Sequence, residues 1–266
     1  MKRLASICGA CALLLPGFAR AAPDPQPGDV PAASIYEIHP VADGAVIAGG
    51  ALATALPYLF TSRLIEPHCP CSAGSVNSFD RGVIGNASAV ADWTSTVVVG
   101  LAIAVPPLAD GLLVRDGRVL AQDLTVLAEA IAVNSVLVTL AKFTTQRPIP
   151  RVYSDPSLAR SPSDYRSFYS GHTSLAMAVL SVGAMTADRR YHLTWQPWAV
   201  AVAVSGGVAA ERILAGSHFY TDVLAGAAAG LVVGTAVSWV HLRGRGLHLS
   251  ATHARDGTML LVQGAF

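Results

Sequence analysis

A histidine and an aspartate in the last quarter of the chain have the spacing of a catalytic pair. His218 and Asp222 are four residues apart, so on a helix they share a face, where the carboxylate can bind one imidazole nitrogen. That contact fixes the tautomer and leaves the other nitrogen free to attack. Arg212 adds a permanent charge just before them. The alternative is that Asp222 only stabilises a helix start and that His218 is solvated.

A second polar segment, Ser170-Gly171-His172, directly precedes an apolar run. Free N–H groups and the positive end of the dipole make a helix start favourable for phosphate. His172 could then protonate a leaving group. Capping of the helix by Ser170 is the simpler alternative, because Ser is a common residue at this position.

A third segment collects cations where Pro148 ends a helix, namely Lys142, Arg147 and Arg151. Lys and Arg near a helix C-terminus commonly only balance the dipole. This segment therefore says little when taken alone.

Together the three segments resemble the signature of the type 2 phosphatidic acid phosphatase and vanadium haloperoxidase-like acid phosphatase superfamily. That signature reads K-x6-R-P, then P-S-G-H, then S-R-x5-H-x3-D. The third block matches at all its charged positions, with Glu211 in place of Ser. The second matches as Ser-Gly-His, with Tyr169 in place of Pro.

The first block departs from the signature. Seven residues on from Lys142 the chain has Ile149-Pro150 instead of Arg-Pro, while Arg147-Pro148 gives the pair at shorter spacing. We therefore assign Arg147 to the second phosphate contact and keep Arg151 in reserve. The motif-bearing part covers residues 142–222, and the helical layout extends the similarity over about 43–242.

The resemblance implies a metal-independent phosphomonoesterase that works through a covalent phosphohistidine. His218 attacks phosphorus, Asp222 holds it, and His172 protonates the departing alkoxide. The groups implied to bind the phosphate oxygens are Lys142, Arg147, Arg212, Ser170 and Gly171. In phosphoryl transfer the protein mostly positions groups and stabilises charge. We expect no metal and no other cofactor.

The composition describes the elements that must hold these residues. Apolar residues make up 52% of the 266 and charged residues 13%, with a mean hydropathy of +0.48. These values exclude intrinsic disorder and argue against an ordinary soluble enzyme. With 18 basic and 17 acidic residues, the chain has no basic field for nucleic acid.

Five uncharged runs close to bilayer length, together with a more polar helix at 120–145 that carries Asp123 and Glu129, predict an all-α six-helix bundle that is membrane-embedded or membrane-associated. Their Ala, Gly and Val content favours close helix packing. A small C-terminal β-hairpin is expected around an Asp-Gly turn at 256–257. The expected helices cover 44–62, 93–109, 120–145, 173–187, 193–210 and 223–242.

We divide the chain into a signal peptide (1–21), a Pro-rich linker (22–42), a helical phosphatase domain (43–242) and a hairpin extension (243–266). Lys2, Arg3 and the A-x-A site at 19–21 support the signal. Export implies an oxidising compartment. In it, Cys69 and Cys71 are expected as a loop disulfide or free thiols rather than as metal ligands.

The expected location is a bacterial inner membrane, with the active site facing the periplasm. Arginine-rich helix ends should be cytoplasmic, yet a cleaved signal would leave residue 22 outside on that side. Either an early helix does not cross, or the bundle is soluble in the periplasm. The expected substrate is a lipid phosphate: phosphatidic acid, phosphatidylglycerophosphate, a polyprenyl diphosphate or lipid A. The alternatives are a broad-specificity soluble acid phosphatase acting on small phosphomonoesters, a vanadate-dependent haloperoxidase, and a scaffold with a degenerate site.

Overall fold

Long helices form over each of the six segments expected to be helical, which confirms the predicted all-α bundle. The computed structural model describes residues 34–69, 71–243, 248–254 and 257–263. Polar side chains mark several helix starts: Ser88, Asp116 and Ser170 each accept a hydrogen bond from a backbone N–H of the first turn. The long helices are α1 (Pro40–Leu59), α3 (Ala89–Val114), α4 (Gly117–Thr145), α6 (Gly171–Tyr191), α7 (Gln196–Leu214) and α8 (Tyr220–His241).

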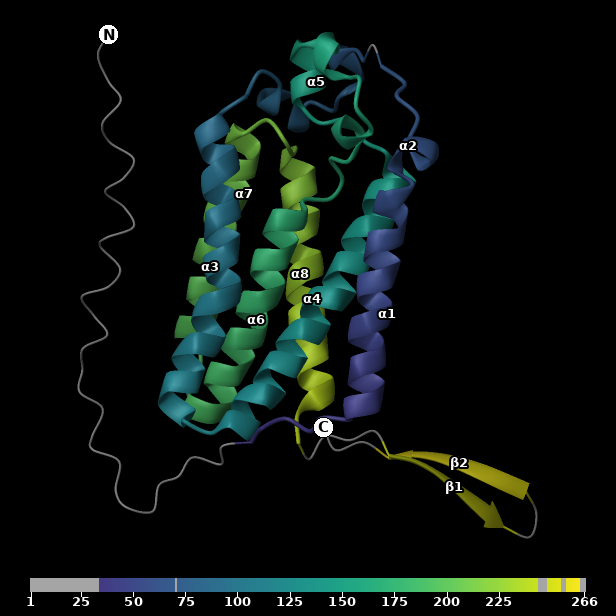
Figure 1. Cartoon of the computed structure of the whole chain (residues 1–266), viewed down its shortest axis with the longest axis vertical. Helices are drawn as coiled ribbons and strands as arrows, with labels where there is room; N and C mark the ends of the chain where they lie inside the picture. Colours follow the sequence, from purple (N-terminus) through teal and green to yellow (C-terminus); the bar gives the residue numbers. More distant parts are fainter. Residues whose placement is uncertain (1–33, 70, 244–247, 255–256, 264–266) are drawn as a thin grey trace. The chain divides into compact units, whose positions relative to one another are not determined.

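The remaining helices are short and gather at one end of the bundle, at the top of Figure 1. They are α2 (Thr61–Leu64), α5 (Arg151–Ser154), and the 3-10 turns η1 (Ala73–Ser75), η2 (Asp80–Val83), η3 (Pro156–Leu158) and η4 (Pro162–Tyr165). A small apolar cluster that includes Ile65, Ile149, Val152 and Tyr165 packs beneath them. This end therefore has a core of its own, which can hold polar loops in place.

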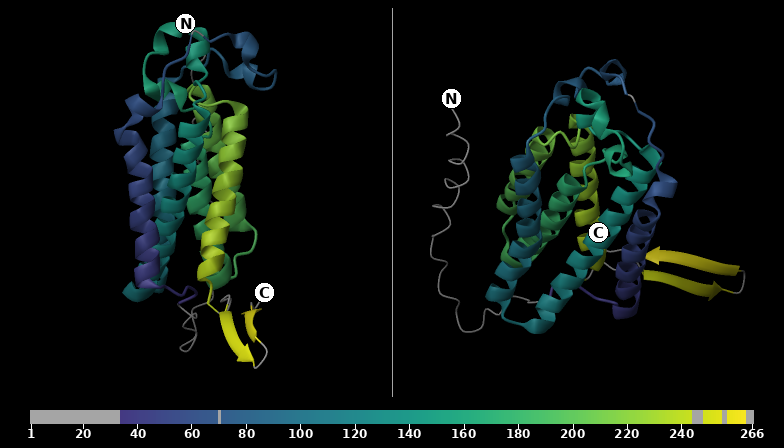
Figure 2. Two further views of the ribbon diagram at one scale, coloured as in Figure 1. Left: turned by 90° about the vertical axis from the view of Figure 1, so that its right-hand side faces the viewer. Right: turned by 45° about the horizontal axis from the view of Figure 1, so that its top comes forward.

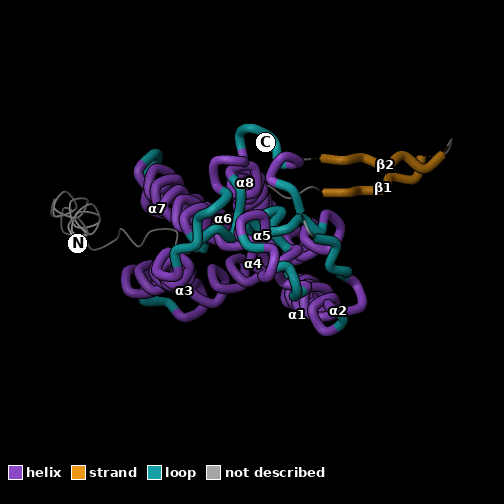
Figure 3. Tube along the Cα trace, turned by 90° about the horizontal axis from the view of Figure 1, so that it is seen from above, coloured by secondary structure: helices purple, strands orange, loops and turns teal. Residues whose placement is uncertain are grey.

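Helix α6 lies at the centre of the bundle. Seen from above, it is surrounded by α3, α4, α7 and α8 (Figure 3), and it packs against all four. Helix α1 stands at the edge and packs on α4, as the two further views also show (Figure 2). The residues that cap or begin α6 are thus placed among several other helix ends.

A glycine stripe lets α8 approach α6 closely. Gly226, Gly230 and Gly234 recur every four residues, so they lie on one face of α8. A Cβ added at Gly230 would lie 2.2 Å from the carbonyl oxygen of Ser174 on α6. Only glycine fits there, which agrees with the close packing expected from the small residues.

An ion-pair cluster joins three helices toward the other end of the bundle. Arg190 of α6 is buried and donates to Asp123 of α4 at 2.8 and 2.9 Å and to Asp110 of α3 at 2.5 Å. Tyr191 also donates to Asp110. One guanidinium thus pairs with two buried carboxylates.

Five helices, α1, α3, α4, α7 and α8, are long and apolar enough to cross a membrane, judged by length and composition. Only 6% of the apolar stretch of α1 is buried. Large apolar side chains point outward on several helices, among them Leu52, Leu101, Leu108, Val202 and Val232. Helix α6 is not one of the five; its buried residues include several hydroxyls and Arg190.

The last part of the chain forms two antiparallel strands, β1 (His248–Ala254) and β2 (Gly257–Gln263), with Ala254 opposite Gly257. Both strands lie within 243–266, the segment in which the hairpin is expected. Helix α1 begins at Pro40, a few residues before the expected domain boundary. The expected signal peptide and most of the linker lie outside the described residues. Cys69 and Cys71 form a disulfide, one of the two states expected for them.

Candidate active site

A pocket of about 380 Å³ opens at the end of the bundle that carries the short helices. Its walls come from the end of α4, the start of α6, the end of α7 and the loop before α8. Among the residues that line it are Lys142, Arg151, Arg166, His172, Arg212 and His218. Most of the predicted site is therefore brought together from segments tens of residues apart.

His218 is held by a backbone carbonyl rather than by Asp222. It precedes α8, which starts at Tyr220, so the helical spacing assumed for the His–Asp pair does not apply. Its Nδ1 lies 2.6 Å from the carbonyl oxygen of Ser167 and 4.0 Å from the nearest Asp222 oxygen. Because a carbonyl only accepts, Nδ1 donates the proton. The lone pair of a neutral His218 then resides on Nε2.

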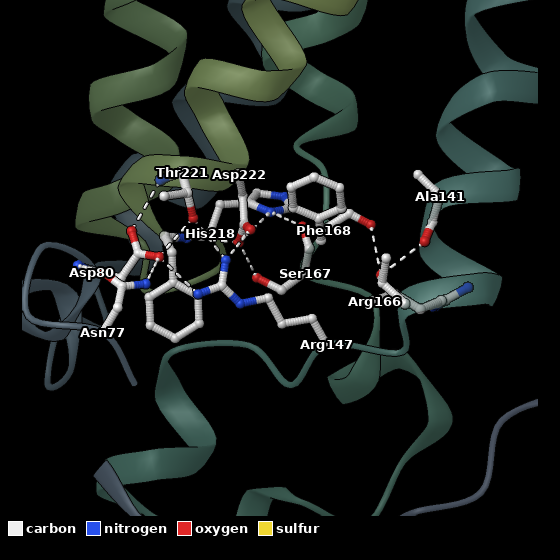
Figure 4. A network of polar contacts seen from close by, with 12 residues as sticks. Asn77, Asp80, Ala141, Arg147, Arg166, Ser167, Phe168, His218, Thr221 and Asp222 are labelled. Atoms are coloured by element: carbon white, nitrogen blue, oxygen red, sulfur yellow. Dashed lines mark hydrogen bonds and ion pairs between the residues drawn. The ribbon is translucent and has the colours of Figure 1, made fainter. Parts of the chain in front are cut away.

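Asp222 supports this arrangement indirectly. Its carboxylate accepts from the Phe219 backbone N–H at 2.9 Å, which caps α8, and from the Ser167 hydroxyl at 2.5 Å. Ser167 supplies the carbonyl that orients His218 (Figure 4). Asp222 is fully buried and is not among the residues that line the pocket. It is therefore a positioning residue in this structure.

Arg147 departs from the expectation that it contacts phosphate. Its guanidinium lies between two carboxylates, 2.5 Å from Asp222 and 2.8 Å from Asp80 (Figure 4). It also stacks over the Phe219 ring. Arg147 is not among the pocket-lining residues, whereas Arg151, the reserve, is one of them. The carboxylates satisfy the Arg147 charge before any ligand binds, and this explains the difference.

Asp80 is a site-supporting residue that the sequence did not reveal. It is fully buried and also accepts hydrogen bonds from the Thr221 backbone and hydroxyl. Burial alone would raise the pKa of the Asp80 carboxyl, but hydrogen bonds from Arg147 and Thr221 hold it below its usual value. A buried arginine needs an acidic partner, yet nothing in the spacing identifies one 67 residues away.

The cations that line the pocket keep donors available. Arg212 donates to Asp92 at 2.6 Å, and Lys142 donates to the Arg166 carbonyl at 2.6 Å. In the described part of the chain, the buried Nε atoms of Arg151 and Arg212 have no hydrogen-bond partner. Four cations line this pocket, Lys142, Arg151, Arg166 and Arg212, so it is suited to an anionic ligand.

The electrostatic setting keeps His218 neutral. Burial lowers the pKa of His218 well below its ordinary value, and the charges of Lys142 and Arg212 lower it further. A neutral imidazole has the lone pair that nucleophilic attack requires. The pocket thus combines a neutral histidine with surrounding positive charge.

The start of α6 contributes His172 and Gly171 to the pocket. His172 Nε2 lies 3.2 Å from the Thr96 hydroxyl of α3. Ser170, expected on phosphate, is fully buried and not among the lining residues. Its hydroxyl accepts from the Thr173 N–H and so caps α6. The structure therefore agrees with the simpler alternative for Ser170, in which it caps the helix.

The family model described as PAP2 superfamily matches residues 123–245, a range that contains all three predicted blocks. Residues 123–245, a little under half of the chain, are thus identified as PAP2 superfamily. No curated protein matches the chain.

Two solved PAP2-type structures are distantly similar to it. LpxE of Aquifex aeolicus is 24% identical, over 59% of this chain and 90% of that one, with a TM-score of 0.41. A transmembrane phosphatidylglycerolphosphate phosphatase from Bacillus subtilis is 19% identical, over 70% and 94%, with a TM-score of 0.42.

Proposed function

We propose that this protein hydrolyses phosphate monoesters through a phosphohistidine formed on Nε2 of His218. One observation carries the proposal: a buried, neutral histidine has its Nδ1 bound to the Ser167 carbonyl and lies in a pocket lined by four cations. Phosphoryl transfer needs positioned groups and positive charge around the equatorial oxygens. The pocket offers both.

The proposed reaction has two displacements at phosphorus. In the first, the Nε2 lone pair of His218 forms the N–P bond while the ester P–O bond breaks, and a protonated His172 gives its proton to the departing alkoxide. Burial and the charges of Arg212 and Lys142 lower the pKa of His172 to about 4, so this role requires the negative charge of the bound phosphate to raise that pKa again. In the second, a water attacks phosphorus and returns its proton to His172. The N–P bond breaks, inorganic phosphate leaves, and His218 regains its lone pair.

We assign the phosphate oxygens to Lys142, Arg151, Arg212 and the N-terminal end of α6 at Gly171. Arg151 replaces Arg147 in this assignment, because Arg151 lines the pocket and has an unpaired buried donor. A guanidinium can bind phosphate through two parallel hydrogen bonds. Arg147 instead anchors Asp222, and through it the segment that orients His218.

We infer that the substrate is a lipid phosphate. The outward-facing apolar side chains on α1, α3, α7 and α8 would be costly in water and are suited to a bilayer. The pocket lies where these helices end, near Tyr58 at the end of α1. A lipid could keep its chains in the bilayer and present its phosphate there.

We propose that the pocket faces the periplasm. The opposite end of the bundle carries arginines at or near the ends of α3, α4, α6 and α8: Arg115, Arg118, Arg189 and Arg243. Arg190 lies at the same end of α6, but it forms ion pairs with Asp110 and Asp123. Positive loops stay cytoplasmic, which puts the pocket on the other side.

Phosphate release by the detergent-purified protein tests the substrate class. Phosphatidic acid, phosphatidylglycerophosphate, a polyprenyl diphosphate and lipid A would be compared with glycerol 3-phosphate, which carries no acyl chain. A higher kcat/KM on one or more lipids supports the proposal, with His218→Ala as the inactive control. Equal values on both classes would indicate a broad-specificity acid phosphatase. Vanadate-dependent bromination without hydrolysis would indicate a haloperoxidase.

A further inference from the structure

Three ionisable side chains meet far from the active site, between helices that are distant in sequence. Asp43 is in the first turn of α1, Glu129 is in α4, and His241 is in the last turn of α8. All three are buried, with exposed fractions of 5%, 9% and 6%. At 1.5 Å per residue, His241 lies roughly 30 Å along α8 from Asp222. We call these three residues the His241 cluster.

The ligand atoms of the His241 cluster converge on one point. Nε2 of His241 lies 3.0 Å from Glu129 Oε2 and 3.6 Å from Asp43 Oδ1, and all three ligand atoms lie within 4.8 Å of one another. Zinc binds such nitrogen and oxygen atoms at about 2.0–2.2 Å, which separates neighbouring ligands by about 3–3.6 Å. The two separations from His241 fall in this range, so a single ion could bind between these atoms after small side-chain adjustments.

Two of these side chains already form a hydrogen bond through their other polar atom. His241 Nδ1 lies 2.9 Å from the Val237 carbonyl oxygen, so Nδ1 donates and Nε2 points into the cluster. Asp43 Oδ2 accepts from the His39 backbone N–H at 2.8 Å, which leaves Oδ1 for the cluster. A histidine that donates its other N–H to a carbonyl has the arrangement usual for metal ligands.

Glu129 supplies an independent observation. Its Oε2 is buried and has no hydrogen-bond partner in the described part of the chain, although it lies near His241 Nε2. In a neutral His241, the lone pair of Nε2 would face this carboxylate oxygen. Two acceptors at this distance need a cation between them or a proton.

The His241 cluster also differs from the other buried acids in the cation that accompanies the carboxylates. Asp110 and Asp123 share Arg190, and the two acids beside the active site likewise share Arg147. Within the described residues, no Lys or Arg pairs with Asp43 or Glu129. A protonated His241 would give the cluster the same single negative net charge as the two arginine-paired groups, whereas a neutral His241 would leave both carboxylates without a cation in an apolar bundle, which is costly. A divalent cation would balance both carboxylates.

We propose that Asp43, Glu129 and His241 bind a divalent transition-metal ion, and that Zn²⁺ best suits this donor set. Carboxylate and imidazole ligands with open positions are typical of such ions. The ion would connect α1, which packs at the edge on α4, to both α4 and α8. Its role would be structural, because the cluster lies at the end of the bundle opposite the pocket.

Metal binding to the full-length protein in detergent tests the proposal. After chelator treatment, titration calorimetry with Zn²⁺ should show one equivalent bound. The isosteric Glu129→Gln and the His241→Gln variants should each weaken binding by about 10-fold or more. The matched control is His39→Gln, an exposed histidine next to Asp43 that retains its backbone contact. The control should bind as the wild type does.

A second measurement guards against unfolded variants. Co²⁺ added to the wild type should give the visible absorption of a four- or five-coordinate site, and Zn²⁺ should displace it. Absence of that spectrum, or equal Zn²⁺ binding by wild type, Glu129→Gln and His241→Gln, would overturn the proposal. Neither result depends on phosphatase activity, so the proposed function would stand or fall separately.

Discussion

Among single residues, the arginines near the active site have two different tasks. Arg147 is bound by Asp80 and Asp222 and holds the segment that orients His218. Arg151 lines the pocket with a donor that no described residue satisfies. Removing the first should therefore affect folding, and removing the second should affect catalysis.

We predict that Arg151→Ala lowers kcat/KM by roughly 10- to 150-fold, the equivalent of a charge-assisted hydrogen bond of about 1.5–3 kcal/mol. Its thermal unfolding in detergent should change little. Arg147→Ala leaves two buried carboxylates unpaired and should lower the free energy of unfolding by about 3–5 kcal/mol. If Arg147→Ala is stable but inactive and Arg151→Ala is fully active, the two assignments must be exchanged.

The pH profile tests the state of His218. Because the pKa of His218 is lowered by burial and by Lys142 and Arg212, the neutral form persists below pH 6.5, the ordinary histidine value. Activity that requires it is lost only as the pH falls through the lowered pKa. Lys142→Gln removes one of these charges, so the acid limb of kcat/KM should move to higher pH. The wild type and Lys142→Gln are assayed with the same substrate, so ionisation of the substrate affects both pH profiles equally. An unmoved limb would contradict the role given to the charge.

That His218 and His172 lie in one pocket could be predicted from the sequence because their residue types and order are distinctive. The placement of Arg147 and Ser170 could not, because spacing does not say which charges or hydroxyls the fold will satisfy internally. Asp80 carried no sequence signal at all, since its partners are distant along the chain. The His–Asp contact was expected from a helix that in fact begins two residues after His218.

Among the elements, the contact between α6 and α8 determines the distance between His172 and His218, the two histidines that we propose to be catalytic. His172 lies at the start of α6, and His218 lies in the loop just before α8. The glycine stripe of α8 keeps these two helices close. The stripe is therefore a positioning device for the site, although it does not contact the pocket.

We predict that Gly230→Ala destabilises the protein by about 1–3 kcal/mol, because its Cβ would collide with the Ser174 carbonyl and overpack the contact. Turnover should fall as well, since the helices must separate. Gly207→Ala on α7 is the matched control, because nothing lies within 4 Å of its Cβ. It should be neutral or slightly stabilising. Similar losses in both variants would show that the helix contact is not responsible.

The existence of the six long helices was predictable because apolar runs of this length rarely form any other secondary structure. Their exact partners were not, since α6 resembles its neighbours in Ala and Gly content but lies at the centre. The short helices between α4 and α6 escaped prediction because their polar sequence, around Ser154 to Arg166, follows no period. They nevertheless form one wall of the pocket.

For the whole molecule, the distribution of apolar side chains predicts where the protein resides. Helix α1 buries little of its apolar stretch, and exposed leucines such as Leu101 and Leu108 on α3 have no cover in the described structure. We expect the protein to stay with membranes after osmotic shock and an alkaline carbonate wash, and to dissolve only in detergent. Release with the soluble periplasmic contents would support the soluble alternative instead.

The central claim is that His218 carries the phosphoryl group. The most direct measurement is rapid quenching of the purified protein with a ³²P-labelled lipid phosphate, followed by mapping of the labelled peptide. Our account predicts one label per chain on His218, labile in acid and stable in alkali, and no label in His218→Asn. Label retained in that variant, or phosphate released by it at the wild-type rate, would contradict the mechanism.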